Sequence, residues 1–162
     1  MAPAGAARTL LLVLGSLPGR ASLKAQRYYA HPQNQFWRLL GAALGAPLAE
    51  FDYPDRLARL AQRQVALWDV VGAAKRSGSL DSALREVRIN PLADYVARQP
   101  QLRAIGFNGQ AAAKLGRRAL FETPLTLIDL PSSSPAYTIA FADKAAHWSV
   151  LANFAAAATL VR

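Results

Sequence analysis

Aromatic, amide and imidazole side chains are concentrated in one short stretch of the chain. Residues 28–37 read Tyr-Tyr-Ala-His-Pro-Gln-Asn-Gln-Phe-Trp, within a polypeptide that is otherwise rich in Ala, Leu and Arg. Aromatic rings can stack on a planar ligand, and an amide or an imidazole can hydrogen-bond to the edge of that ligand. The stretch therefore indicates a binding site for a planar heterocycle.

Four short apolar runs are typical of buried strands, and helical patterns flank them. The runs lie at residues 9–14, 65–68, 102–107 and 125–130. Strands that alternate with helices predict a three-layer α/β/α fold with a short, mainly parallel, four-stranded central sheet. Helices are expected at residues 34–44, 54–64, 91–98, 110–119 and 141–160.

Polar residues follow each of the four predicted strands. They are the loop at residues 15–34, Asp69, the pair Asn108 and Gly109, and the Pro-Ser-Ser-Ser-Pro segment at residues 131–135. The carboxyl ends of parallel strands meet at one edge of the sheet, where ligands bind in folds of this class. We therefore expect one site at this edge. Asp69 is its best-placed carboxylate, although a helix cap or an ion pair would also explain this residue.

Length and composition limit the possible classes of protein. The 162 residues fit one domain, with residues 1–7 expected to be flexible, and the chain is predicted to be a monomer. Cysteine is absent and there are two histidines, so neither a metal nor another cofactor is predicted. No apolar run approaches the roughly 20 residues that span a bilayer. These features favour a cytoplasmic location.

The net charge of +9 favours a polyanionic partner, and nucleic acid is the first candidate. Three basic residues precede the aromatic stretch and are the expected contacts to DNA phosphates: Arg20, Lys24 and Arg27. An arginine bias inherited from a GC-rich genome would explain the charge equally well. The position of these residues beside the predicted site has to decide between DNA binding and a bias in composition.

Four segments together resemble the uracil-DNA glycosylase superfamily: residues 15–19, 29–37, 107–109 and 130–135. The similarity is greatest to the hypoxanthine-DNA glycosylase branch, followed by the mismatch-specific uracil and thymine glycosylases. It runs in order over residues 10–148, and its most specific part is the His-Pro-Gln-Asn-Gln-Phe-Trp block at residues 31–37. The resemblance implies a monofunctional repair glycosylase, a hydrolase of base excision repair. Such an enzyme flips a deaminated base, hypoxanthine or uracil, out of DNA and cleaves its N-glycosidic bond to leave an abasic site.

The resemblance also implies roles for individual residues. Tyr29 matches the aromatic residue on which the flipped base stacks, and Asn108 matches an asparagine that reads the edge of the base. Leu17 stands where the mismatch-specific relatives carry a water-positioning asparagine, so the catalytic role is expected at Asn34, as in the hypoxanthine branch. Ordinary structural roles compete with these assignments. Tyr29 could equally be a core aromatic residue. Asn34 could be a helix N-cap, and Asn108 could be part of an ordinary turn.

Further contacts are expected on both sides of the base. Ser16 and His31 are predicted to bind the base, although backbone groups alone would also satisfy this histidine. The segment at residues 131–135 matches a loop that contacts phosphates and fills the gap left by the flipped base, with Tyr137 as the candidate wedge. The remaining predicted DNA contacts are Ser132, Ser133, Ser134 and Lys144. A plain Pro/Ser turn and a packing role for Lys144 are the alternatives.

Two other functions remain possible from the sequence alone. A nucleoside or nucleotide hydrolase of the same fold would act on free metabolites, and a carboxylate cluster for metal or ribose would mark it. A non-catalytic nucleic-acid-binding domain would use the charge of +9 without releasing any base. Changes at Tyr29 and Asn34 would leave the binding of such a domain unaffected.

Overall fold

Four parallel strands form at the four apolar runs of the sequence. In the computed structural model, which describes residues 1–76 and 84–158, they are β2 (Leu11–Gly15), β3 (Val65–Asp69), β6 (Ala104–Asn108) and β7 (Thr126–Leu130). The sheet order is β1-β3-β2-β6-β7, and the β2–β3, β2–β6 and β6–β7 pairs are all parallel. The carboxyl ends of these four strands lie at the same edge.

The sheet has five strands instead of the four predicted. The additional strand is β1 (Ala4–Gly5), which pairs antiparallel with β3. Residues 1–7, predicted to be flexible, are attached to the core in the structure. The Trp68 indole N–H donates to the carbonyl of Met1, and the Tyr28 hydroxyl donates to the carbonyl of Ala2. Two small residues, Ala-Gly, carry no strand signal, so sequence reasoning missed this pairing.

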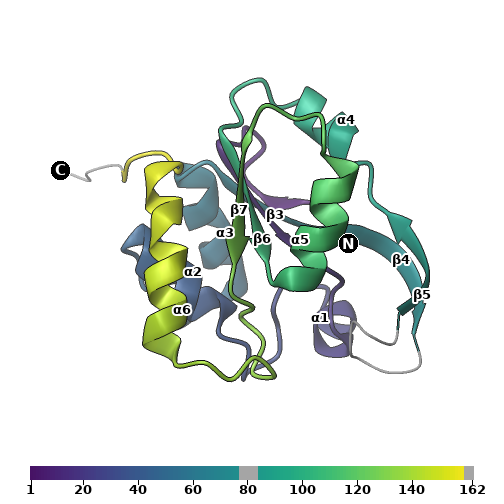
Figure 1. The fold of residues 1–162 in the computed structure, drawn as a ribbon. Coiled ribbons are helices and arrows are strands. Elements are labelled where there is room, and N and C mark those ends of the chain that lie inside the picture. Colours follow the sequence, from purple (N-terminus) through teal and green to yellow (C-terminus); the bar gives the residue numbers. More distant parts are fainter. Residues whose placement is uncertain (77–83, 159–162) are drawn as a thin grey trace.

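Helices cover both faces of the sheet (Figure 1). Alternating side chains of the strands build one core on each face. Leu11 and Val13 of β2 pack with α2 (Phe36–Leu44), α3 (Tyr53–Gln62) and α6 (Phe141–Trp148). Leu12 and Leu14 pack with α4 (Leu92–Ala97) and α5 (Gln110–Ala119). The period of two in the strand therefore produces the predicted three layers.

Several elements differ from the sequence-based expectation. The helix expected at residues 141–160 ends at Trp148 and continues as the short 3₁₀ helix η3 (Ser149–Asn153). Arg63 explains the change, because it holds the following chain through a pair of hydrogen bonds with Ala156. Residues 159–160 lie outside the described residues. Elements that were not predicted are α1 (Arg20–Ala25), η1 (Leu48–Glu50) and the hairpin of β4 (Val71–Arg76) and β5 (Leu84–Ile89).

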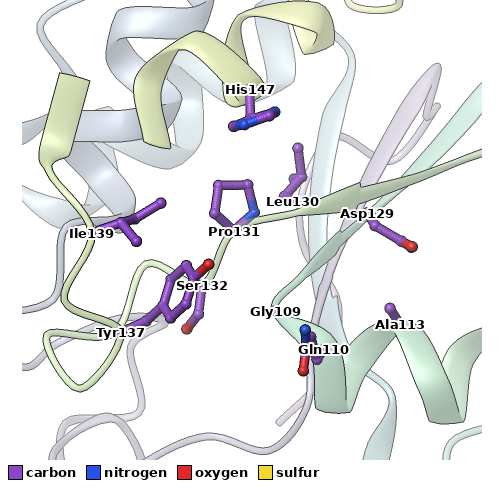
Figure 2. Close-up of a pocket in the computed structure, with 10 residues that line it drawn as sticks. All are labelled: Gly109, Gln110, Ala113, Asp129, Leu130, Pro131, Ser132, Tyr137, Ile139 and His147. Carbon is purple, nitrogen blue, oxygen red and sulfur yellow. The ribbon is translucent and has the colours of Figure 1, made fainter. Parts of the chain in front are cut away.

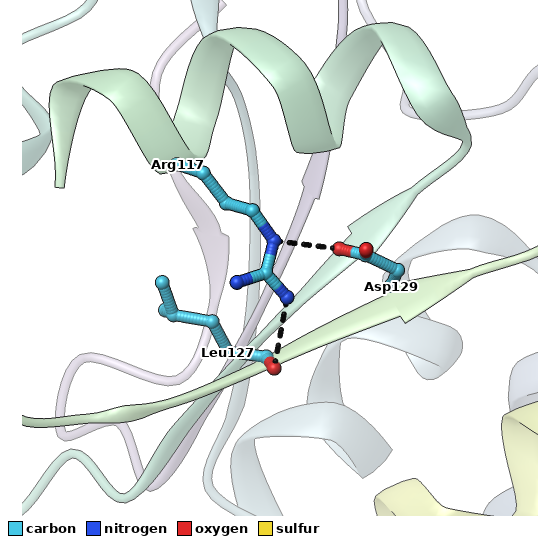
Figure 3. A network of polar contacts seen from close by, with 3 residues as sticks. All are labelled: Arg117, Leu127 and Asp129. Carbon is cyan, nitrogen blue, oxygen red and sulfur yellow. Dashed lines mark hydrogen bonds and ion pairs between the residues drawn. The ribbon is translucent and has the colours of Figure 1, made fainter. Parts of the chain in front are cut away.

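The edge strand β7 is joined to α5 by Arg117. Its guanidinium donates to the Asp129 carboxylate over 2.9 Å and to the Leu127 carbonyl over 3.2 Å (Figure 3). Both side chains of this ion pair are exposed, so the pair itself adds little stability. The main effect of Arg117 is to hydrogen-bond the Leu127 carbonyl on the edge strand β7. None of the helices within the described residues is long and apolar enough to cross a bilayer.

Candidate functional site

The loops after the four parallel strands surround one pocket of about 380 Å³. The residues predicted to bind or cleave a substrate come together there: Ser16, Tyr29, His31, Asn34 and Asn108 all line it. Leu17 and Asp69 also line the pocket, as do residues of the segment at 131–135. Residues far apart in the sequence thus share one cavity, as expected for the carboxyl edge of a parallel sheet.

Tyr29 is held in a fixed orientation beside the pocket. Its ring stacks on the buried Phe36 ring with a centroid distance of 3.7 Å and an interplanar angle of 10°. Its backbone is left-handed, with φ of 55°, a conformation that non-glycine residues rarely adopt. One face of the ring is occupied by Phe36, so only the opposite face is left for a ligand.

The Tyr29 hydroxyl lies in a dry environment. It is buried and makes no hydrogen bond of good geometry within the described residues. Burial and the nearby Asp69 carboxylate raise the pKa of Tyr29, and the Asn108 amide offsets part of that rise. The hydroxyl is therefore neutral at physiological pH. Gly15 is required beside it, because a Cβ there would come within 2.8 Å of both the Tyr29 hydroxyl and the Asp69 carboxylate.

Asn34 lies at the start of α2, where its amide oxygen accepts two hydrogen bonds. The donors are the Phe36 backbone N–H at 2.9 Å and the Ser133 hydroxyl at 2.8 Å. The first contact satisfies the N–H of the first residue of α2, whereas the N-cap position itself is Gln35, one residue after the cap that the sequence offered as an alternative. This contact does not use the amide nitrogen, Nδ2, which has no hydrogen-bond partner within the described residues. Asn34 can therefore bind the first N–H of α2 and still offer its own N–H groups to the pocket.

Asn108 ends β6 and forms a two-point contact with Ser133. Its Nδ2 donates to the Ser133 hydroxyl over 2.8 Å, and its Oδ1 accepts from the Ser133 N–H over 2.9 Å. Gly109, with φ of 93°, follows it, and a Cβ there would lie 3.2 Å from Cβ of Ser132. One amide hydrogen and one oxygen lone pair of Asn108 are left over for a ligand.

The structure corrects two of the predicted DNA contacts, Ser133 and Lys144, because each is only 1% exposed. Lys144 points inward from α6 and donates to the Gln35 side chain over 2.9 Å and to the Ser134 carbonyl over 3.2 Å. Burial lowers the pKa of this ammonium group. Both residues therefore support the loop at 131–135 from within. The contribution of Gln35 had not been predicted.

The other predicted contacts are accessible. Arg20 lines the pocket, and Lys24 and Arg27 are exposed on α1 and just after it. Ser132 and Ser134 accept hydrogen bonds from backbone N–H groups two residues further on, which shapes the loop and leaves each hydroxyl able to donate. His31 is exposed, and its Nδ1 accepts from the Gln33 N–H over 3.1 Å.

A second hollow, of about 470 Å³, lies on the other side of the turn at Pro131 and Ser132. Figure 2 shows its lining, with His147 on α6 and the side chains of Tyr137 and Ile139 on the loop before that helix. Tyr137, the candidate wedge, is 46% exposed, and its ring centroid is 5.5 Å from the Lys144 ammonium. Its role as a wedge stays a prediction.

Groups suitable for metal binding are not clustered in this site. Within residues 1–76 and 84–158, three or more His, Asp or Glu side chains never meet in a way that would hold an ion. Asp69 is buried at 4% exposure, and its carbonyl accepts from the Asn90 side chain over 2.8 Å. The chemistry that this pocket offers is therefore stacking, directed amide, hydroxyl and backbone hydrogen bonds, and the single carboxylate of Asp69.

Comparisons with known proteins agree with this geometry. The family model described as the uracil DNA glycosylase superfamily matches residues 2–156. Two relatives carry the name hypoxanthine DNA glycosylase. The protein from Methanosarcina acetivorans is 41% identical over 131 residues, which cover 79% of this chain and 80% of the relative. The protein from Methanosarcina barkeri is 40% identical over 106 residues, which cover 65% of this chain and 67% of the relative.

A solved structure has the same fold. The solution NMR structure of a candidate uracil DNA glycosylase from Methanosarcina acetivorans superposes with a TM-score of 0.84, at 34% identity. The match covers 93% of each chain. With the family model extending over nearly the whole sequence, this likeness leaves one conclusion: the chain belongs to the uracil DNA glycosylase superfamily.

Proposed function

We propose that this protein is a DNA repair glycosylase that flips a deaminated base, hypoxanthine or uracil, out of DNA and hydrolyses its N-glycosidic bond. One observation carries the proposal: Tyr29, Asn34 and Asn108 line a single pocket that both amides and the ring enter in fixed orientations. The names of the two Methanosarcina relatives favour hypoxanthine as the substrate base.

A deaminated base suits the groups of this pocket. Hypoxanthine and uracil are planar lactams, in which an N–H lies beside a C=O. The free face of Tyr29 offers stacking, and the remaining hydrogen and lone pair of Asn108 match that adjacent pair. Flipping costs a few kcal/mol, which stacking in the pocket and contacts to the DNA backbone offset.

The proposed reaction requires no covalent intermediate. The bond between C1′ and the base nitrogen breaks, its electron pair leaves with the base, and a water oxygen bonds to C1′. The proton released by that water neutralises the departing base. The Asn34 N–H groups and backbone N–H groups stabilise charge that develops in the transition state. The sugar becomes oxocarbenium-like, and the flanking phosphates stabilise its positive charge.

Oligonucleotides with one damaged base test the proposal. Hypoxanthine, uracil, xanthine or thymine is placed opposite each normal base, in duplex and in single-stranded DNA, and base release is followed. Release of hypoxanthine or uracil with an intact sugar-phosphate strand supports the proposal. Release from free deoxyinosine alone would identify a nucleoside hydrolase, and binding without release would identify a non-catalytic domain.

We predict full activity in EDTA and strand breakage only after treatment with alkali. The described pocket lining contains no lysine that could form a Schiff base, and the described residues hold no cluster of metal ligands. The assay compares base release with and without chelator, followed by heating with or without alkali. An adduct trapped by borohydride, or inactivation by the chelator, would contradict a monofunctional, metal-independent mechanism.

Affinity for undamaged duplex should fall steeply with salt, because basic side chains displace counterions condensed on DNA. Replacing Arg20, Lys24 and Arg27 by glutamine should lower the slope of log affinity against log salt by about 0.9 for each phosphate that is no longer bound. The matched control replaces three exposed arginines near the opposite edge of the sheet, Arg98, Arg103 and Arg118. Equal effects of the two triple changes would show that α1 is not the DNA-binding surface.

A further inference from the structure

Ser133 lies between the two asparagines of the proposed site. Its hydroxyl accepts from Asn108 Nδ2 and donates to Asn34 Oδ1, each over 2.8 Å. Its backbone is fixed as well, because its N–H donates to Asn108 Oδ1 and its carbonyl accepts from the Gln35 N–H. This buried serine is thus the link between the end of β6 and the start of α2.

Two backbone N–H groups determine the direction of this chain of hydrogen bonds. A backbone N–H can only donate, so the amide atom that faces the Phe36 N–H must be the oxygen of Asn34. For the same reason the atom facing the Ser133 N–H must be the oxygen of Asn108. The hydroxyl has a single proton, which it gives to Asn34, and it accepts from Asn108 in return. Neither amide can flip without breaking two hydrogen bonds.

We propose that Ser133 is a positioning residue whose hydroxyl fixes the Asn34 amide, so that Asn34 acts in the pocket as a hydrogen-bond donor. This proposal rests on the glycosylase function proposed above. Both hydrogen bonds to Asn34 Oδ1 hold the oxygen at the Phe36 and Ser133 side, and Nδ2 is the group left for a ligand. A donor stabilises negative charge on the departing base, whereas an acceptor would orient a water.

The buried lysine of α6 holds the serine in place. Lys144 donates to Ser134, the next residue of the loop, and to the side chain of Gln35. The Gln35 N–H in turn binds the Ser133 carbonyl over 3.0 Å. Residues at the start of α2 and on α6 therefore both fix the loop, which keeps Ser133 in one position in the pocket.

Single-turnover base release at saturating enzyme tests the positioning role. Ser133→Ala should slow release by roughly tenfold or more, because it removes one of the two hydrogen bonds that hold the Asn34 amide and leaves only the contact from the Phe36 N–H. Affinity for undamaged duplex should change by less than about twofold, because the buried hydroxyl does not reach phosphate. The matched control is Ser149→Ala, which removes an exposed hydroxyl that donates to the Ala146 carbonyl. An unchanged rate with weaker DNA binding would overturn the proposal.

A double-mutant cycle separates positioning from general loosening of the fold. If Ser133 acts through Asn34, then Ser133→Ala should cost nothing further in an Asn34→Ala background. Additive losses would show that Ser133 acts independently of Asn34 and would overturn the proposal. Thermal unfolding of each variant shows that the compared proteins are folded.

Asn34→Asp tests the donor role directly. A carboxylate keeps both acceptor contacts and has no proton to donate, so its rate of release should fall at least as far as that of Asn34→Ala. A rate near that of the wild type would show that Asn34 acts as an acceptor, which contradicts the proposal.

A measurement without substrate distinguishes failure of this inference from failure of the glycosylase function. The side-chain amide NMR signals of Asn34 and Asn108 should both shift in Ser133→Ala and stay in place in Ser149→Ala. Unmoved signals would overturn the positioning role even if the enzyme is active. A wild-type protein that releases no base would instead overturn the proposed function, while shifted signals would still establish the Ser133 network.

Discussion

Asn34→Ala should release the target base more slowly than the wild type by on the order of 10²-fold or more in single-turnover experiments. The amide nitrogen is the only end of this side chain left for the substrate, because the oxygen binds Phe36 and Ser133. DNA affinity should remain close to that of the wild type, because the basic residues proposed to contact phosphates are unchanged.

Loss of the contact between Asn34 and the start of α2 has to be separated from loss of catalysis. Removing the contact to the Phe36 N–H should lower the free energy of unfolding by ~1 kcal/mol, which corresponds to about 2–4 °C in Tm for a chain of this length. A variant with this small shift in Tm and a normal rate of base release would show that Asn34 only stabilises the start of α2. The catalytic role would then move to Asn108, Asp69 or backbone groups.

Tyr29→Ala should weaken capture of the flipped base by ~1–3 kcal/mol, which is roughly 5- to 150-fold in affinity for damaged DNA. The ring is backed by Phe36 at 3.7 Å and offers its other face to the pocket, so the alanine variant loses the whole stacking surface. The measurement is the affinity for a duplex with one damaged base, compared with the affinity for the undamaged duplex. Only the first affinity should change.

Tyr29→Phe is the matched control. It keeps the ring and removes a hydroxyl that has no hydrogen bond of good geometry within the described residues, so its effect should be mild. Equal losses in the phenylalanine and alanine variants would contradict stacking and would assign the role to the hydroxyl. Thermal unfolding of both variants identifies any loss that comes from the core beside Phe36.

The parts of the fold that the sequence predicts are those with strong local signals. Continuous apolar runs marked β2, β3, β6 and β7, and the rule that ligands bind at the carboxyl edge brought their loops together correctly. Short elements have no comparable signal. The strand β1 has two residues and α1 has six, and both depend on tertiary contacts for their stability.

The candidate site was predictable to a similar extent. The resemblance to the superfamily identifies Tyr29, Asn34 and Asn108 as candidates, but the partners of each amide depend on rotamers that only the packed loops define. The burial of Lys144, in contrast, could have been predicted from the sequence. It lies three residues after Phe141 and four before Trp148, on the apolar stripe of α6, and a lysine on such a stripe needs buried acceptors.

Detection of the free base tests the proposed glycosylase activity most directly. A duplex with one hypoxanthine is incubated with the protein, and the small-molecule fraction and the DNA are analysed separately. We predict free hypoxanthine together with an equal amount of alkali-labile abasic site, and far less of both products with Asn34→Ala in the same time. Tight binding of the damaged duplex without free hypoxanthine, and without release of uracil from uracil-containing DNA, would show that the protein is not a glycosylase for these bases.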